Sequence, residues 1–126
     1  MSLVDVSISE GVATLTLNNP AERNTLTAPM VAEILAAMDA IEADDGVGAL
    51  VVTGAAPAFC AGANLGNLAE ASGDSLGTIY AGFLRIADSP LPTIAAVNGA
   101  AAGGGFALVL GSDVRLAARA AKFNAA

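Results

Sequence analysis

The stretch Phe59-Cys60-Ala61-Gly62-Ala63-Asn64-Leu65 decides how this chain is interpreted. It follows a continuous apolar run over residues 47–53, which is typical of a strand buried on both faces. Ligand sites in α/β proteins form at the carboxyl ends of such strands. Taken alone, residues 61–64 fit a ligand-binding turn and an ordinary surface turn equally well.

A second stretch of small residues, Asn98-Gly99-Ala100-Ala101-Ala102-Gly103-Gly104-Gly105-Phe106-Ala107-Leu108, follows an apolar run over residues 93–97. Each glycine costs roughly 1 kcal/mol relative to alanine inside the helix that is expected here. The first N–H groups of a helix have no partner within the helix and can bind an anionic oxygen. For the glycine run alone, tight packing against Val97 or the strand beside it is the favoured alternative. As a pair, the two turns could direct N–H groups at one carbonyl oxygen and form an oxyanion hole.

The spacing of apolar residues predicts alternating strands and helices. Thr27 is expected to cap a helix that ends near residue 43, and Glu10-Gly11 is expected to turn a hairpin. This order indicates an α/β fold with a mostly parallel sheet, and residues 1–126 are expected to form one domain or part of one. The expected strands are 4–8, 12–17, 47–53, 93–97 and 114–117; the expected helices are 27–43, 64–71, 75–88 and 103–110; residues 21–26 form a loop, and 122–124 begin a further element.

The composition excludes several classes of function. The chain of 126 residues has a net charge of −7 and only five Lys and Arg, so we expect no nucleic-acid partner. No apolar run reaches the roughly 18 residues that a membrane span needs, so no membrane partner is expected. The apolar fraction of 55% suggests that some apolar surface meets another part of the protein or another subunit.

Histidine is absent, and Cys60 is the single cysteine. The lack of histidine excludes a Ser-His-Asp or Cys-His nucleophile and any histidine-based metal site, and we expect no metal ion. It also argues against a serine peptidase of a related spiral fold. A single cysteine cannot form an intrachain disulfide, and the amino terminus shows no secretory leader pattern, so we expect a cytoplasmic protein.

Together the two turns resemble the enoyl-CoA hydratase/isomerase (crotonase) superfamily. The resemblance implies a spiral of ββα units, acyl-CoA thioester substrates, and a homotrimer or hexamer. It implies no cofactor beyond the coenzyme A that the substrate carries. Members of the family are longer, and the C-terminal helices that cover their acyl pocket are missing here. The matching segments are residues 19–26, 58–65, 92–99 and 103–113.

Site residues follow from the resemblance position by position. The backbone N–H groups of Ala63 and Gly104 would form the oxyanion hole for the thioester oxygen. Coenzyme A would lie along residues 61–66 and the loop around 23–26, where Arg23 is either a phosphate contact or a solvated loop arginine. The implied substrate-binding residues are Arg23, Thr25, Ala61, Ala63, Asn64, Leu65, Gly66 and Gly104.

The two catalytic glutamates of a family hydratase have no counterpart in this sequence. Ala107 stands where the first catalytic glutamate is expected, and its methyl group can transfer no proton. The second glutamate would fall just beyond Ala126. Glu70 and Asp74 could line the acyl pocket, although a solvated helix end or cap is the favoured interpretation. Other candidate groups near the turns are expected to be structural: Asp113 as a helix-end residue, Cys60 as a small buried residue and Tyr80 as part of the core.

These observations predict an acyl-CoA enzyme that stabilises a thioester enolate in a backbone oxyanion hole. Isomerisation with a single base, or another enolate reaction, fits better than hydration with two glutamates, because Ala107 replaces one of them. The alternative is a non-catalytic acyl-CoA-binding protein or a truncated remnant of such an enzyme.

Overall fold

A five-stranded sheet organises the computed structural model, which describes residues 2–62 and 73–125. Its strand order is β1-β2-β3-β4-β6, with β1 antiparallel to β2 and the later neighbours parallel. Cα register pairs run from Val4 with Leu17 in the hairpin to Val97 with Ala117 at the other edge. The strands are β1 Val4–Ser9, β2 Val12–Leu17, β3 Ala49–Gly54, β4 Thr93–Val97 and β6 Val114–Ala117; a separate parallel pair joins β5 Ala101–Ala102 to β7 Phe123–Asn124.

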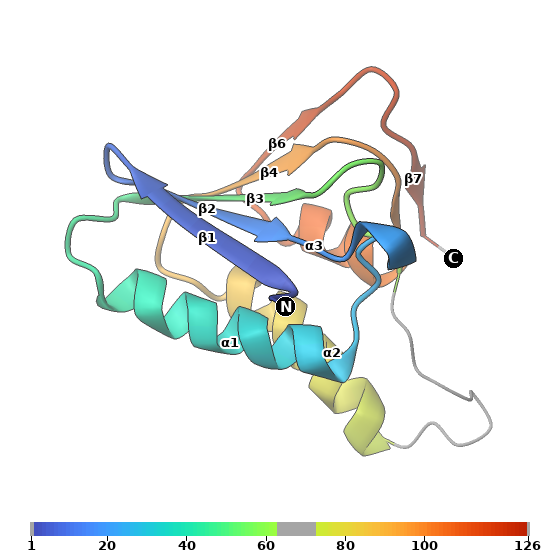
Figure 1. Cartoon of the computed structure of the whole chain (residues 1–126), viewed down its shortest axis with the longest axis horizontal. Helices are drawn as coiled ribbons and strands as arrows, with labels where there is room; N and C mark the ends of the chain where they lie inside the picture. The colour runs from blue at the N-terminus through green and yellow to red at the C-terminus, as the bar shows by residue number, and fades with distance from the viewer. Residues whose placement is uncertain (1, 63–72, 126) are drawn as a thin grey trace.

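Two long helices lie on the same side of this sheet (Figure 1). They are α1, Ala28–Ala43, and α2, Gly73–Ala87; the shorter α3, Gly104–Leu110, contacts α2 and β4. The Thr27 hydroxyl accepts a hydrogen bond from the Met30 N–H at 3.3 Å, so the predicted cap is confirmed. The predicted loop over 21–26 is wrong at its start, because Pro20–Glu22 form a 3-10 turn. The helix predicted over 64–71 lies outside the described residues.

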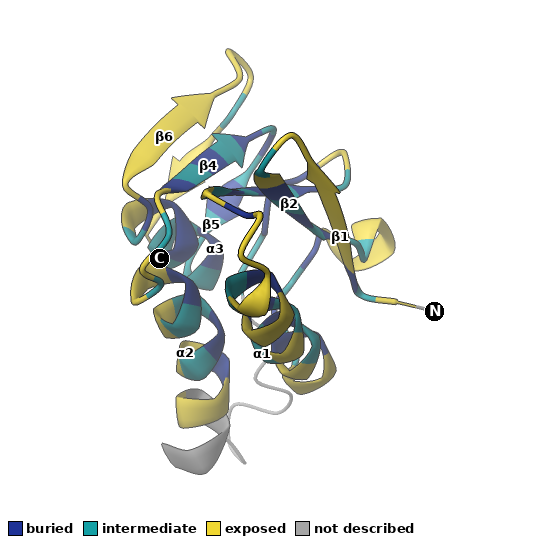
Figure 2. Ribbon diagram, turned by 90° about the vertical axis from the view of Figure 1, so that its left-hand side faces the viewer, coloured by how far each residue is buried: buried dark blue, intermediate teal, exposed yellow. Residues whose placement is uncertain are grey.

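The core fills the space between the sheet and the helices (Figure 2). Ala13, Leu15 and Leu17 on β2 are fully buried, and the residues between them are half-buried. The same alternation occurs in β3 and β4, so the prediction that β3 is buried on both faces is wrong. Strand β6, at the edge of the sheet, is exposed along its whole length.

Helix α2 contacts the core through a narrower stripe than its sequence indicates. Ile79 and Ile86 are buried, whereas Tyr80 is 49% exposed and Leu84 is 50% exposed. The prediction that Tyr80 belongs to the core is therefore wrong. Between Tyr80 and Leu84, Gly82 packs closely on α1, since an added Cβ would lie 3.0 Å from Val31 Cγ2.

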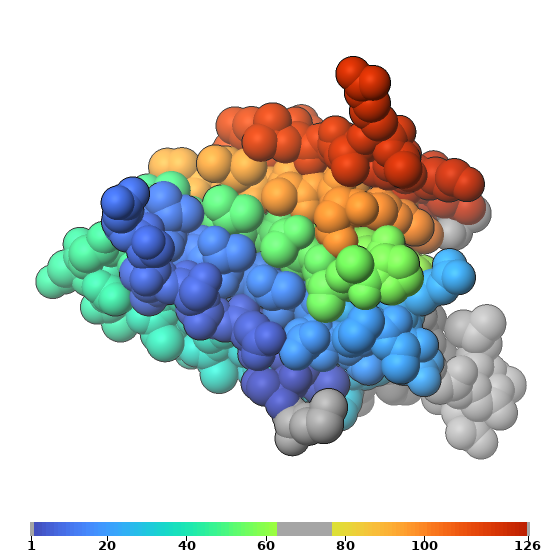
Figure 3. Space-filling model, turned by 45° about the horizontal axis from the view of Figure 1, so that its top comes forward, coloured from blue at the N-terminus to red at the C-terminus, as the bar shows by residue number. Residues whose placement is uncertain are grey.

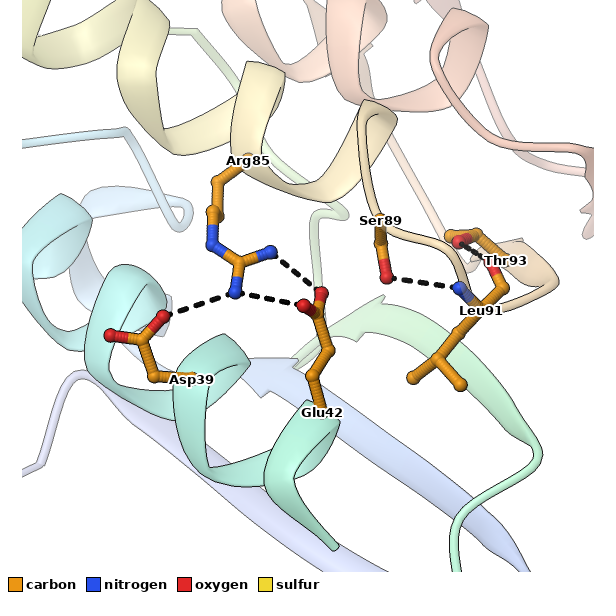
Figure 4. Close-up of polar contacts among 6 residues, drawn as sticks. All are labelled: Asp39, Glu42, Arg85, Ser89, Leu91 and Thr93. Atoms are coloured by element: carbon orange, nitrogen blue, oxygen red, sulfur yellow. Dashed lines mark hydrogen bonds and ion pairs between the residues drawn. The ribbon is translucent and has the colours of Figure 1, made fainter. Parts of the chain in front are cut away.

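Arg85 ties the two long helices together with ion pairs (Figure 4). Its guanidinium donates to Glu42 at 2.6 and 3.0 Å and to Asp39 at 3.0 Å. The hydrogen bond from Arg85 holds the pKa of Glu42 below its ordinary value, and the pKa of Arg85 is raised in turn. The chain then turns into β4 through Ser89, whose hydroxyl accepts from the Leu91 N–H at 3.2 Å.

The two edges of the sheet lie on opposite sides of the molecule (Figure 3). The N-terminal hairpin occupies one side, and β6 with the C-terminal residues occupies the other. Within residues 2–62 and 73–125, none of the helices combines the length and apolar character needed to cross a bilayer.

Candidate active site at the carboxyl edge of the sheet

The two glycine-containing stretches meet at the carboxyl ends of β3 and β4. The Phe59 and Cys60 N–H groups both donate to the Ala100 carbonyl at 3.1 Å, and the Ala102 N–H donates to the Cys60 carbonyl at 3.1 Å. Cys60 also forms a parallel bridge with Ala101. Segments far apart in the sequence are therefore joined backbone to backbone at this edge.

Gly105 makes this junction possible. A Cβ at Gly105 would overlap the Cys60 carbonyl oxygen and would lie 2.7 Å from the carbonyl carbon. Gly105 thus serves tight packing, and the backbone nearest to it is that of Cys60. The first turn of α3 lies directly against the Cys60 backbone as a result.

The backbone at the start of α3 presents Gly104 as the first helical residue. The Gly103 N–H donates to the Asn124 carbonyl at 2.9 Å, and the Ala107 N–H donates to the Gly103 carbonyl at 3.0 Å. Gly104 has no acceptor within α3 because it opens the helix, and among the described residues no carbonyl from elsewhere accepts from it. On the facing segment, Gly62 is the last described residue, and Ala63 lies outside the described residues.

The loop that carries Arg23 lies beside the same segment. The Ala61 N–H donates to the Arg23 carbonyl at 3.0 Å, and the Leu26 N–H donates to the Gly62 carbonyl at 2.9 Å. Arg23 is exposed, and its φ of 53° places it in the left-handed region. The half-buried Thr25 donates its hydroxyl to the Glu22 carbonyl at 2.6 Å. The structure thus brings Arg23, Thr25 and Ala61 together, whereas Asn64, Leu65 and Gly66 lie outside the described residues.

Ala107 lies one turn into α3 and is half-buried. Its N–H and C=O groups are used in hydrogen bonds to Gly103 and Gly111, and its methyl group offers no acid or base. Asp113 is structural as predicted, because its carboxylate accepts from the Thr93 N–H at 2.9 Å. Glu70 lies outside the described residues, and Asp74 lies in the first turn of α2.

Cys60 is fully buried, as predicted. Burial raises the pKa of its thiol to about 11, because the interior disfavours the thiolate. Its Sγ donates to the Gly62 carbonyl at 3.5 Å. A thiol in this state is not a nucleophile near neutral pH. Among the described residues, no group of His, Cys, Asp and Glu is large enough to hold a metal ion.

Two asparagines were not identified as site residues from the sequence. Asn24 is fully buried and accepts from the Asn19 N–H at 2.8 Å. Its amide donates to the carbonyls of Ala55, Ala58 and Phe59 at 2.9, 2.9 and 3.3 Å. Asn98 is half-buried and bonds to the same loop. Both asparagines lie inside the segments that carry the family resemblance, 19–26 and 92–99.

The mostly parallel sheet, with two small-residue turns joined at its carboxyl edge, belongs to an α/β protein of the crotonase fold. A family model for enoyl-CoA hydratase/isomerase matches residues 7–126. The chain belongs to this family, and the resemblance drawn from its sequence is confirmed.

Relatives and solved structures agree with that assignment. A probable enoyl-CoA hydratase of Mycobacterium tuberculosis is 48% identical over 124 residues, which cover 95% of this chain and 48% of that protein. The 1,2-epoxyphenylacetyl-CoA isomerase of Escherichia coli is 39% identical, over 98% of this chain and 50% of that protein. The crystal structure of an enoyl-CoA hydratase/isomerase from Xanthobacter autotrophicus matches with a TM-score of 0.88 and 40% identity, over 97% of this chain and 48% of that one. The chain thus spans about half the length of the relatives it matches.

Proposed function

We propose that this chain is the oxyanion-bearing part of an acyl-CoA enzyme of the enoyl-CoA hydratase/isomerase family. The observation that carries the proposal is the contact of Gly105 with the Cys60 backbone. It places the segment that leads to Ala63 against the first turn of α3, where Gly104 stands. In the proposal, the Ala63 and Gly104 N–H groups donate to the thioester oxygen as the enolate forms. Each such donor stabilises a transition state by roughly 3–4 kcal/mol.

The coenzyme A portion of the substrate binds along residues 61–66 and the adjoining loop at 23–26. Support comes from the hydrogen bonds that join these segments, from Ala61 to Arg23 and from Leu26 to Gly62. The exposed Arg23 is the cation that contacts a phosphate in this arrangement. No cofactor beyond coenzyme A and no metal ion takes part.

The reaction is an isomerisation or another enolate reaction with a single base, because the alanine at position 107 cannot supply a second acid. The base comes from a part of the protein outside the described residues. Assembly into a homotrimer or hexamer and a cytoplasmic location complete the proposal. An isomerase name for the Escherichia coli relative is consistent with this chemistry, while the Mycobacterium tuberculosis relative has the name of a hydratase.

Two assays on the whole protein test this function. We expect slow or absent hydration of crotonyl-CoA, and measurable movement of the double bond in a 3-enoyl-CoA. The matched variant is Ala107→Glu, which places a carboxylate at the missing position and is expected to raise hydration relative to the starting protein. Hydration of crotonyl-CoA at the rate of an ordinary family hydratase by the unaltered protein would contradict the proposal.

A second candidate is an acyl-CoA-binding protein without catalysis. Two observations favour it. Ala107 has no acid or base, and the Asp113 carboxylate already accepts a hydrogen bond from the Thr93 N–H. Calorimetric titration with an acyl-CoA separates the two candidates. Binding without turnover of any thioester supports the second candidate, and the absence of binding contradicts both.

A further inference from the structure

We propose that Asn24 and Asn98 are positioning residues that fix the loop after β3, and thereby set Ala61 and Gly62 relative to the first turn of α3. This inference rests on the proposed function, because a carbonyl-binding site at this edge needs the two segments at a constant separation. Displacements well below the length of a hydrogen bond are enough to weaken such a site.

Asn98 extends the sheet with its side chain. The backbone register between β3 and β4 ends at Val52 and Ala95. Beyond it, the Gly54 N–H donates to Asn98 Oδ1 at 3.2 Å, and Asn98 Nδ2 donates back to the Gly54 carbonyl at 2.8 Å. The carboxamide thus takes the place of a peptide group of β4 and holds the end of β3.

Asn24, which comes from the segment before α1, bonds to the same loop after β3. Its φ of 58° is in the left-handed region, which asparagine tolerates better than most residues. This conformation directs the amide at three acceptors of the loop, the carbonyls of Ala55, Ala58 and Phe59. The backbone on either side of Asn24 meanwhile bonds directly to Ala61 and Gly62.

The two amides converge on one atom, the Ala58 carbonyl oxygen, at 2.9 Å from Asn24 and 3.3 Å from Asn98. There is little space for the loop to move. A Cβ at Gly54 would lie 2.6 Å from the same oxygen and 2.9 Å from Asn24 Nδ2. Any displacement of Ala58 passes along the backbone to Cys60, whose carbonyl group lies against Gly105.

The test replaces each amide with a carboxylate of the same shape, in Asn24→Asp and Asn98→Asp. Each substitution removes the N–H donors and puts a negative oxygen against backbone carbonyls. Met38→Ala is the control, since Met38 is a fully buried residue of α1 that makes none of these hydrogen bonds. Urea is added so that all variants are compared at the same free energy of unfolding. If neither aspartate variant folds, Asn98→Ser is measured in the same way.

The first measurement is amide hydrogen exchange in the unliganded protein. We expect exchange at Cys60, Ala61 and Ala102 to rise about tenfold in the asparagine variants, the equivalent of one lost hydrogen bond, and not in the Met38→Ala control. Equal exchange in all variants would overturn the inference. This result does not depend on any ligand, so it stands or fails apart from the proposed function.

The second measurement is the affinity for an acyl-CoA thioester relative to that for the thioether that lacks the carbonyl. We expect the thioester to bind about tenfold better in the unaltered protein, and this preference to vanish in the asparagine variants while the Met38→Ala control keeps it. A preference retained in all variants overturns the inference. A wild-type protein without any preference contradicts the proposed function instead, and leaves the exchange result to decide the positioning role.

Discussion

The α1–α2 interface and the junction at the carboxyl edge of the sheet are held by different kinds of contact. Side chains hold the helices together, with Val31 against Gly82 and Arg85 paired with Glu42. Backbone groups and carboxamides hold the junction, where Gly105 lies on the Cys60 carbonyl group. Side chains can adjust their rotamers and their charges change with pH, whereas a peptide group can do neither. The interface should therefore tolerate substitutions that the junction does not.

The largest expected effect is at the junction. Gly105→Ala forces a Cβ into the Cys60 carbonyl group, and neither backbone can move without breaking the hydrogen bonds to Ala100 and Ala102. We expect a loss of about 3 kcal/mol in the free energy of unfolding, at the upper end for overpacking. Urea denaturation followed by circular dichroism measures it. A loss below about 1 kcal/mol would show that the junction can adjust after all.

A smaller effect is expected when the ion pairs between the helices are removed. Arg85→Met should cost about 1 kcal/mol near neutral pH, because Glu42 is only partly exposed and is held by two hydrogen bonds. The control is Arg119→Met, which removes the same charge from an exposed position. If urea denaturation gives both variants the same loss in the free energy of unfolding, the effect comes from net charge and not from the ion pairs.

The contribution of Arg85 should also depend on pH. The pKa of Glu42 is lower in the folded chain than its ordinary value of 4.5, so its stabilising effect is complete above that value and is lost as pH falls through the folded pKa. We expect the unfolding free energies of the protein and of Arg85→Met to converge as acid is added below pH 4.5. A difference that stays constant through this range contradicts the assignment.

The smallest expected effect is a gain in stability. An added Cβ at Gly77 meets nothing within 4 Å, so Gly77→Ala should raise the free energy of unfolding by roughly 0.5–1 kcal/mol through helix propensity. Gly82→Ala in the same helix should gain less, because its Cβ would lie 3.0 Å from Val31 Cγ2. Thermal denaturation of both variants shows which substitution gives the larger gain in stability. A larger gain for Gly82→Ala than for Gly77→Ala would mean that Val31 leaves room for a methyl group at position 82.

Much of the fold follows from local sequence patterns. Thr27 caps α1 as its position predicts, and Glu10-Gly11 turns the hairpin through two residues with positive φ. The orientation of α2 could not be predicted, because Leu84 is as apolar as the buried Ile79 and Ile86 and is nevertheless 50% exposed. Gly82 packs against Val31 of α1, a contact between two distant segments that no local pattern indicates.

The candidate site could be predicted in outline only. Small residues after two strands indicated that the turns meet, and the hydrogen bonds from Phe59 and Cys60 to Ala100 confirm it. The partner of Gly105 was not predictable, since a glycine has no side chain that indicates its neighbour. The roles of Asn24 and Asn98 depend on hydrogen bonds to loop carbonyls far away in the sequence, and no local pattern encodes them. The roles assigned to Ala63 and Gly104 stay predictions.

Strand β6 has a consequence for how the protein behaves in concentrated solution. It lies at the end of the strand order, and its Val114 and Leu116 side chains are 50% and 62% exposed. The one cation within it, Arg115, directs its guanidinium back to the carbonyls of Val109, Leu110 and Ser112, so it does not shield the outer side of the strand. Unshielded apolar edges pair readily with other strands. If this polypeptide self-associates in concentrated solution, we expect β6 to take part, and substitutions at Val114 and Leu116 to change the concentration needed.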